Sequence, residues 1–330
     1  MIGEAPDQET RGNQPFSDLL WRMWRIRLLD LFCGAGGMAA GFKDTSFEIT
    51  GVDKSETAGA TFETNGYGAF VKSDLSRDII HGDYDVVIGG PPCKPWSLVN
   101  TTRRGVMHRD YRLLTRFFRH IESNVPQAFL MENVPPLMNA EVFRRLTRRL
   151  SARFGYSIES SVITYSDYGA PIRRHRLIVF GVRDGEAAVF FRELSRRKRN
   201  AATVKDAIWH LRKKTKDEVP DHTWPDLKTI NRYLPYYQSG KFGWYILKWD
   251  SPSPSFGNIM KTYILHPDSF NGASPRVISI REALLIMGFP EQFRFSPGLG
   301  LGERYQLVAD SVSPVFSHVA AQILKGIITE

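Results

Sequence analysis

The sequence predicts an α/β fold, an open sheet with helices, followed by a second and smaller domain. Three apolar runs at residues 26–32, 47–53 and 84–88 have the length and composition of buried strands. Each run stops abruptly at glycines, prolines or an acid, and helical patterns recur between the strands. A chain of 330 residues can bury a full core and exceeds the usual size of one domain, so we expect two.

Composition narrows the class of protein. The net charge of +9 suits a polyanionic partner, while the apolar and charged fractions are those of an ordinary soluble protein. Cys33 and Cys93 make no disulfide framework and fit no metal site, so we expect a reducing, cytoplasmic location and no metal. The start of the chain is too polar for a signal peptide, and no apolar run is long enough to span a membrane.

The strongest chemical signal is the segment Gly89-Gly90-Pro91-Pro92-Cys93-Lys94-Pro95-Trp96-Ser97, which follows the strand at 84–88. Open α/β sheets carry their chemistry just beyond the carboxyl ends of their strands. Cys93 is therefore placed as a reactive thiol. The alternative is a thiol that packs as a small hydrophobe, and for a lone cysteine that alternative is the commoner one.

A nucleoside site is indicated by the ends of the first three strands. The turn 33–37, Cys-Gly-Ala-Gly-Gly, follows the first strand and precedes a helical pattern at 38–42, an arrangement that lets a nucleotide approach the backbone. Asp53 ends the second strand, where an acid typically holds ribose hydroxyls, and Asp74 could accept from an adenine amino group. Each acid could instead cap a helix. No phosphate-binding Lys follows the glycines.

Two further features lie beyond Cys93. The loop from Lys94 to Arg109 combines basic and aromatic residues and suits a nucleic-acid backbone, although a solvated loop is the alternative. Glu132 ends the strand at 128–131 and is a second catalytic candidate. Two later strands, near 157–165 and 176–182, flank the basic segment 169–176.

Taken in order, these motifs resemble the DNA (cytosine-5)-methyltransferase family from about Arg27 to Ile327. The resemblance is carried by Asp30-Leu31-Phe32-Cys33-Gly34-Ala35-Gly36-Gly37, Pro92-Cys93, Met131-Glu132-Asn133-Val134, Arg174-His175-Arg176, Arg276 to Ala283 with Gly288-Phe289-Pro290, and Ser311-Val312-Ser313-Pro314.

The resemblance implies a Rossmann-like S-adenosylmethionine-dependent sheet with a smaller target recognition domain. It implies methyl transfer to C5 of a flipped-out cytosine in duplex DNA, through a covalent bond between cysteine and C6. Cys93 would attack, Glu132 would hold the ring, and Arg174 and Arg176 would orient the base. The remaining assignments are Phe32, Gly34, Gly36, Asp53, Asp74 and Pro92 for the cofactor, and Ser97, Arg103 and Arg104 for DNA.

The same resemblance implies four segments. Residues 1–25 form an N-terminal extension, 26–182 the cofactor-binding catalytic domain, 183–275 the target recognition domain, and 276–330 a return segment that completes the catalytic domain. The recognition segment interleaves basic residues with Trp and Tyr side chains, most of which we expect to form that domain's own core. Those singled out are Trp209, Trp224, Tyr233, Tyr236, Tyr237, Trp244 and Trp249. The expected partner is double-stranded DNA, and we expect a monomer that does not associate with a membrane. A cognate restriction endonuclease is a possible second partner.

Two other functions remain open at this stage. One branch of the family methylates transfer RNA, but its Cys-Phe-Thr segment is absent here; a catalytically silent DNA-binding relative would not need Cys93, Glu132 and Arg174. The chain also departs from the family's usual residues at Gly51, Lys94, Ile172, Met287 and Asp310. Lys94 and Asp310 bring a new cation and a new anion, and we expect them to approach one another when the nucleophile loop closes. The alternative is that Lys94 contacts a DNA phosphate and Asp310 caps the last helix.

Overall fold

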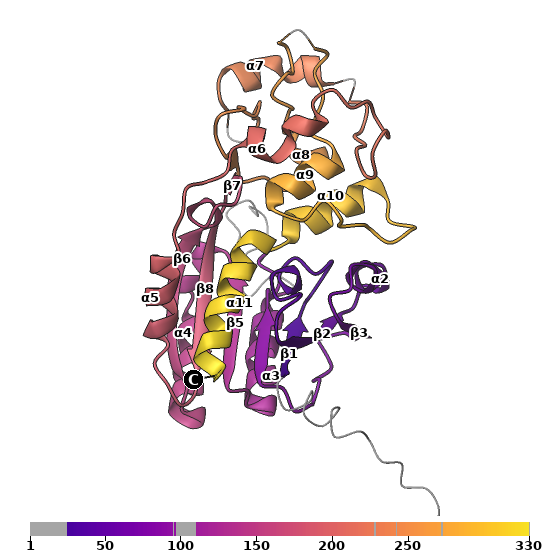
Figure 1. Cartoon of the computed structure of the whole chain (residues 1–330). Coiled ribbons are helices and arrows are strands. Elements are labelled where there is room, and N and C mark those ends of the chain that lie inside the picture. The colour runs from indigo at the N-terminus through magenta and orange to yellow at the C-terminus, as the bar shows by residue number, and fades with distance from the viewer. Residues whose placement is uncertain are drawn as a thin grey trace, which may run out of the picture.

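A computed structural model describes residues 25–94, 96, 110–227, 229–241, 243–271 and 273–329. Figure 1 shows a lower body built around one sheet and an upper body of short helices and loops. The sheet has seven strands in the order β3-β2-β1-β4-β5-β8-β6. Their bounds are β1 Ile26–Leu31, β2 Phe47–Asp53, β3 Ala69–Lys72, β4 Val86–Gly89, β5 Ala128–Asn133, β6 Ser157–Thr164 and β8 His175–Val182.

The directions of the strands determine the edge of the sheet at which a ligand-binding site is expected. β1 pairs in parallel with both β2 and β4, and β5 continues the parallel set, whereas β8 runs antiparallel between β5 and β6. The strand order reverses at β1 and β4, which is the position where open α/β sheets bind ligands beyond their carboxyl ends. Because β8 is antiparallel, its first residues lie at that same edge.

Helices cover both faces of the sheet. One face buries Leu29, Val87 and Phe129 under α3 (Tyr111–Asn124) and α4 (Glu141–Phe154). The other face lies under the 3₁₀ turn η1 (Ala39–Gly41), α5 (Ala188–Arg196) and the last helix, α11 (Pro314–Thr329). A short helix, α2 (Glu56–Thr64), follows β2 and begins at Ser55, whose side chain accepts from the Ala58 amide.

The upper body consists of short elements packed on one buried helix. That helix, α9 (Ile280–Met287), is buried along its whole length and starts with a capping box made by Ser279 and Glu282. The other elements are α6 Val204–Ile208, η5 Trp209–Leu211, η6 Ile230–Tyr233, α7 Leu234–Gln238, α8 Ile259–Thr262 and α10 Leu301–Asp310. A two-stranded pairing of β7 (Ile172–Arg173) with β9 (Ser253–Pro254) joins this body to the chain beside the sheet.

The predicted α/β class is confirmed, and three local expectations are corrected. The pattern at 38–42 forms only the single 3₁₀ turn η1, because Ser317 and His318 of α11 pack directly against Gly41. α5 lies inside the segment 183–275 yet packs against the sheet, where Phe190 stacks on Phe180 at 4.6 Å.

The third correction concerns the expectation that no apolar run is long enough to span a membrane. Residues 301–329 are long and apolar enough to cross a membrane, contrary to the expectation, but 72% of the most apolar window is buried inside the protein. This run is two helices, α10 and α11, separated by residues 311–313. Its apolar character is that of a core element.

Candidate active site

A cavity of about 730 Å³ opens at the carboxyl edge of the sheet, at the point where the strand order reverses. Each of the five parallel strands contributes to its wall through residues at or just beyond its carboxyl end. Phe32, directly after β1, has a left-handed backbone with φ of 60°, a strained conformation for an aromatic residue that is most often found at binding sites. The predicted residues that line the cavity are Phe32, Gly34, Asp53, Asp74, Pro92, Cys93, Glu132, Arg174 and Arg176.

Gly36 is the one described site residue that the structure does not bring to this cavity. Its backbone has φ of 86°, and a Cβ at this position would lie 2.3 Å from the Tyr67 ring. Gly36 therefore lets the turn pack against Tyr67, which is a structural role. Ser97, Arg103 and Arg104 lie outside the described residues, as does the N-terminal extension up to residue 24.

Glu132 is the centre of a buried cluster of polar side chains. Its Oε1 forms an ion pair with Nε of Arg176 at 2.6 Å and accepts a hydrogen bond from the hydroxyl of Tyr165 at 3.0 Å. Sheet register explains the meeting: Glu132 stands opposite Ile178 on β8, and Tyr165 directly follows β6, which pairs with the start of β8. Three strands thus deliver one carboxylate and two donors to the same point.

Cys93 is a part-buried free thiol in the same cavity. Burial raises the pKa of Cys93, and the Glu132 and Asp310 carboxylates raise it further, against the opposing effect of Arg176 and Arg174. The resting group is therefore a thiol, and the two arginines alone do not produce a thiolate.

Arg174 performs a different task from Arg176. Its guanidinium is buried and donates to the backbone oxygens of Ala309 at 2.5 Å and Phe256 at 3.1 Å. Burial, with repulsion from Arg176, lowers the pKa of Arg174 to about 10, so the group stays charged at neutral pH. It ties β8 to two distant segments of the upper body, and its Nε is buried without a hydrogen-bond partner.

The part of the cavity beside β1 and β2 has the features of a nucleoside site. Asp53 accepts from the amides of Gly34 at 3.2 Å and Ser55 at 2.9 Å, so this acid holds the glycine turn against the start of α2. Gly34 has φ of 53°, and a Cβ there would meet nothing within 4 Å, so open space adjoins the backbone. Asp74 accepts from the Ser76 amide at 3.0 Å and lines the same space.

Sequence reasoning missed two residues of this site. Asp30 is 1% exposed, lines the cavity and has one carboxylate oxygen without a partner; burial and repulsion from Asp53 raise its pKa to about 8. A charged residue inside an apolar strand was the available signal for Asp30. Tyr165 carried no comparable signal, because nothing in its neighbourhood along the chain indicates Glu132 as its partner.

Lys94 and Asp310, the two unusual charges, both line the cavity. Asp310 ends α10 and accepts from Gln306 at 2.9 Å, while its charge acts on Cys93. The two residues therefore border the same space, and their mutual pairing remains a prediction.

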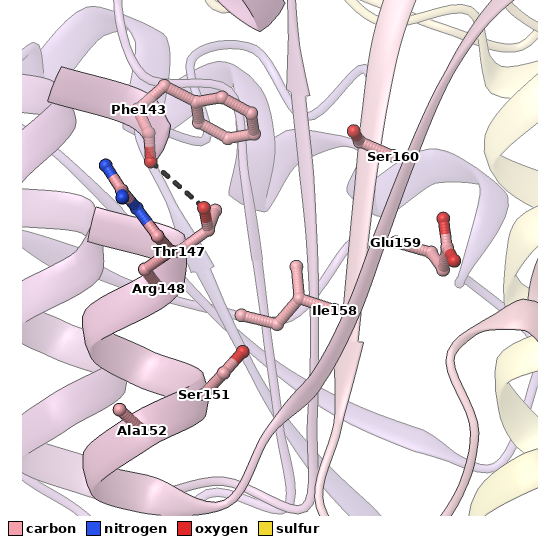
Figure 2. Close-up of a pocket in the computed structure, with 8 residues that line it drawn as sticks. All are labelled: Phe143, Thr147, Arg148, Ser151, Ala152, Ile158, Glu159 and Ser160. Carbon is pink, nitrogen blue, oxygen red and sulfur yellow. Dashed lines mark hydrogen bonds between the residues drawn. The ribbon is translucent and has the colours of Figure 1, made fainter. Parts of the chain in front are cut away.

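A second hollow lies between α4 and β6, away from these residues (Figure 2). Two of its polar groups are engaged within α4: Thr147 donates to the Phe143 oxygen at 3.2 Å, and Arg148 pairs with Glu141 at 3.0 Å. The hollow has no convergent set of reactive groups, so the cavity at the sheet edge is the candidate active site.

Comparisons with known proteins show what this chain is similar to. A family model described as C-5 cytosine-specific DNA methylase matches residues 26–327. Type II methyltransferase M.FnuDI of Fusobacterium nucleatum is 26% identical, covering 92% of this chain and 96% of the relative, and M.NgoPII of Neisseria gonorrhoeae is 27% identical, covering 91% and 95%. Among solved structures, S. pombe Dnmt2 methyltransferase aligns with a TM-score of 0.69 at 16% identity, covering 92% and 99%, and shares the fold.

Proposed function

Because the chain belongs to the C-5 cytosine-specific DNA methylase family and is a DNA cytosine-5 methyltransferase, we propose that it methylates C5 of a cytosine turned out of a specific duplex sequence through a bond between Cys93 and C6. The observation that carries this proposal is the convergence of Cys93, Glu132 and Arg176 in one cavity beside the nucleoside site. A base inside a duplex could not reach the thiol, so flipping is part of the proposal.

The cofactor we propose is S-adenosylmethionine, held by Phe32, Gly34, Asp53, Asp74 and Pro92. Open space beside Gly34 suits a nucleoside, and the unpartnered oxygen of Asp30 suits a cationic group of the ligand, whose charge would favour the ionised carboxylate. When bound, S-adenosylmethionine supplies an electrophilic methyl group.

The protein's own groups would prepare the cytosine to accept that methyl. The proton of the Cys93 thiol passes to Glu132, which removes the anion that opposes a thiolate. Sulfur then adds to C6 while the ring electron pair moves to N3, and Glu132 returns the proton to N3. C5 becomes enamine-like and takes the methyl. The C5 proton is then lost to water as the C6–S bond breaks, and the N3 proton returns through Glu132 to the Cys93 sulfur, which restores the thiol.

Target recognition is assigned to the upper body. Since α5 packs on the sheet, we propose that the recognition region begins after Arg196 rather than at 183. The aromatic residues Tyr233, Tyr237, Trp244 and Tyr263 pack on one another and supply its core, which leaves base reading to loops between them.

The cellular setting is proposed by analogy. We propose that this chain acts as a cytoplasmic monomer on double-stranded DNA, beside a cognate restriction endonuclease. The relatives named above are type II methyltransferases, which supports the endonuclease partner.

Covalent trapping tests the proposal. A duplex carrying 5-fluorocytosine should form a stable adduct, because fluorine cannot leave C5 as a proton does. Cys93→Ser should abolish adduct and methyl transfer while DNA binding persists; an adduct formed by Cys93→Ala would refute the assignment. Tritium transfer from labelled cofactor to duplex DNA, and none to transfer RNA, decides the substrate, and sequencing the methylated product gives the target site.

A further inference from the structure

The two oxygens of Glu132 have different surroundings. Oε1 forms an ion pair with Arg176 and accepts a hydrogen bond from Tyr165. Oε2 lies on the side of Gly90, where a Cβ would be 3.6 Å away, and so faces the segment that leads to Cys93. The side chain is held from one side and open on the other.

Tyr165 is well placed to be a fixed donor. Its side chain is fully buried, and burial beside Glu132 keeps the pKa of the phenol well above its ordinary value, so the hydroxyl keeps its proton at neutral pH. The ring stacks on Phe316 with centroids 5.4 Å apart, and the Tyr165 amide donates to the Arg174 oxygen at 3.1 Å. Ring and backbone together fix the direction of the hydroxyl.

The charge and the donor beside Oε1 limit where a proton can reside. Oε1 faces the Arg176 cation at 2.6 Å and accepts the Tyr165 hydrogen bond, so a proton on Oε1 would be repelled by that cation and would compete with that donor. A proton arriving at Glu132 is therefore favoured on Oε2.

We propose that Tyr165 is a positioning residue: its hydrogen bond and the Arg176 ion pair together occupy Oε1 of Glu132, so that the proton exchanged with the cytosine ring is carried on Oε2. This inference rests on the proposed function. In the addition step the proton moves from Oε2 to N3 as the C6–S bond forms, and the negative charge left on Glu132 is stabilised by Tyr165 and Arg176. Arg176 supplies the charge, whereas Tyr165 supplies the hydrogen bond.

Tyr165→Phe removes that donor and keeps the ring that stacks on Phe316. Tyr168→Phe is the matched control, because Tyr168 is equally buried, packs against the same Phe316 ring at 5.5 Å, and makes no hydrogen bond to Glu132. Both variants are measured by single-turnover methylation, steady-state KM for DNA and thermal midpoint.

The expected result is a rate of methyl transfer about 10-fold or more lower for Tyr165→Phe, with KM for DNA unchanged and a thermal midpoint close to that of Tyr168→Phe. Tyr168→Phe should keep the full rate. In a Glu132→Gln background, Tyr165→Phe should cause little further loss, because an amide has no proton to place.

Equal rates for the two tyrosine variants would overturn the inference. So would a loss from Tyr165→Phe that persists undiminished in Glu132→Gln, since the hydroxyl would then act elsewhere. If the wild-type protein forms no adduct with 5-fluorocytosine, the proposed function itself fails, whereas an intact adduct with an unimpaired Tyr165→Phe rejects only the role of Tyr165.

Discussion

The substitution Gly34→Ala, which adds one methyl group, distinguishes a loss of protein stability from a loss of affinity for the cofactor. Gly34 has φ of 53°, so alanine there is disfavoured by about 1 kcal/mol relative to glycine. No atom lies within 4 Å of the new Cβ, so no clash adds to this cost in the protein itself. In the complex, the same methyl occupies space that the nucleoside needs. Overpacking of this kind costs about 1–3 kcal/mol, or a roughly 5- to 150-fold weaker complex.

Gly155 provides the matched control. It ends α4 with φ of 74°, also has open space around a would-be Cβ, and is absent from the cavity wall. Gly34→Ala and Gly155→Ala should therefore lose similar stability in urea unfolding, about 1 kcal/mol each. Calorimetric titration with S-adenosylhomocysteine should show weaker binding for Gly34→Ala only. Equal affinities in the two variants would refute the placement of the cofactor beside Gly34.

Three further predictions concern charge. Alkylation of Cys93 by iodoacetamide, followed by mass spectrometry, should accelerate about tenfold per pH unit up to pH 8.5, because the raised pKa of Cys93 keeps the side chain a thiol below that pH. Glu132→Gln should speed the alkylation, because it removes a carboxylate that raises this pKa. A rate that stops rising below pH 7.5 would contradict this account. Duplex DNA binding should weaken with salt, with a slope of log K against log salt steeper than about −3, and a flat response would argue against a duplex partner. A double-mutant cycle of Lys94→Gln and Asp310→Asn on single-turnover methylation should show coupling of about 1 kcal/mol or more if the two charges pair, and additive effects would instead favour a phosphate contact for Lys94.

The features that could be predicted from the sequence are those that depend on residues close together along the chain. Buried strands end where glycine, proline or an acid follows them, so the places of Cys93, Glu132 and Asp53 could be predicted from short apolar runs. The cavity joins these residues because parallel strands end at one edge of a sheet. Those site roles remain predictions, since geometry establishes nearness and not chemistry.

The missed features depend on contacts between distant segments. Tyr165 meets Glu132 only because β8 inserts antiparallel between β5 and β6, which no local pattern specifies. The shortening of the pattern at 38–42 to one turn likewise depends on a helix near the other end of the chain. Arg174 was predicted as a ligand of the base, yet its bonds to Ala309 and Phe256 show that it also joins segments far apart in sequence.

The packing of α11 on η1 has a consequence for the order in which this protein can be completed during synthesis. Ser317 donates to the backbone oxygen of Gly37 across 280 residues of chain. At translation rates of about 5–20 residues per second, the glycine turn leaves the ribosome roughly 14–56 s before the helix that covers it. During that interval the part of the sheet's apolar face that α11 covers stays exposed, although α5 has already emerged. We therefore expect methylation activity to appear only after α11 docks.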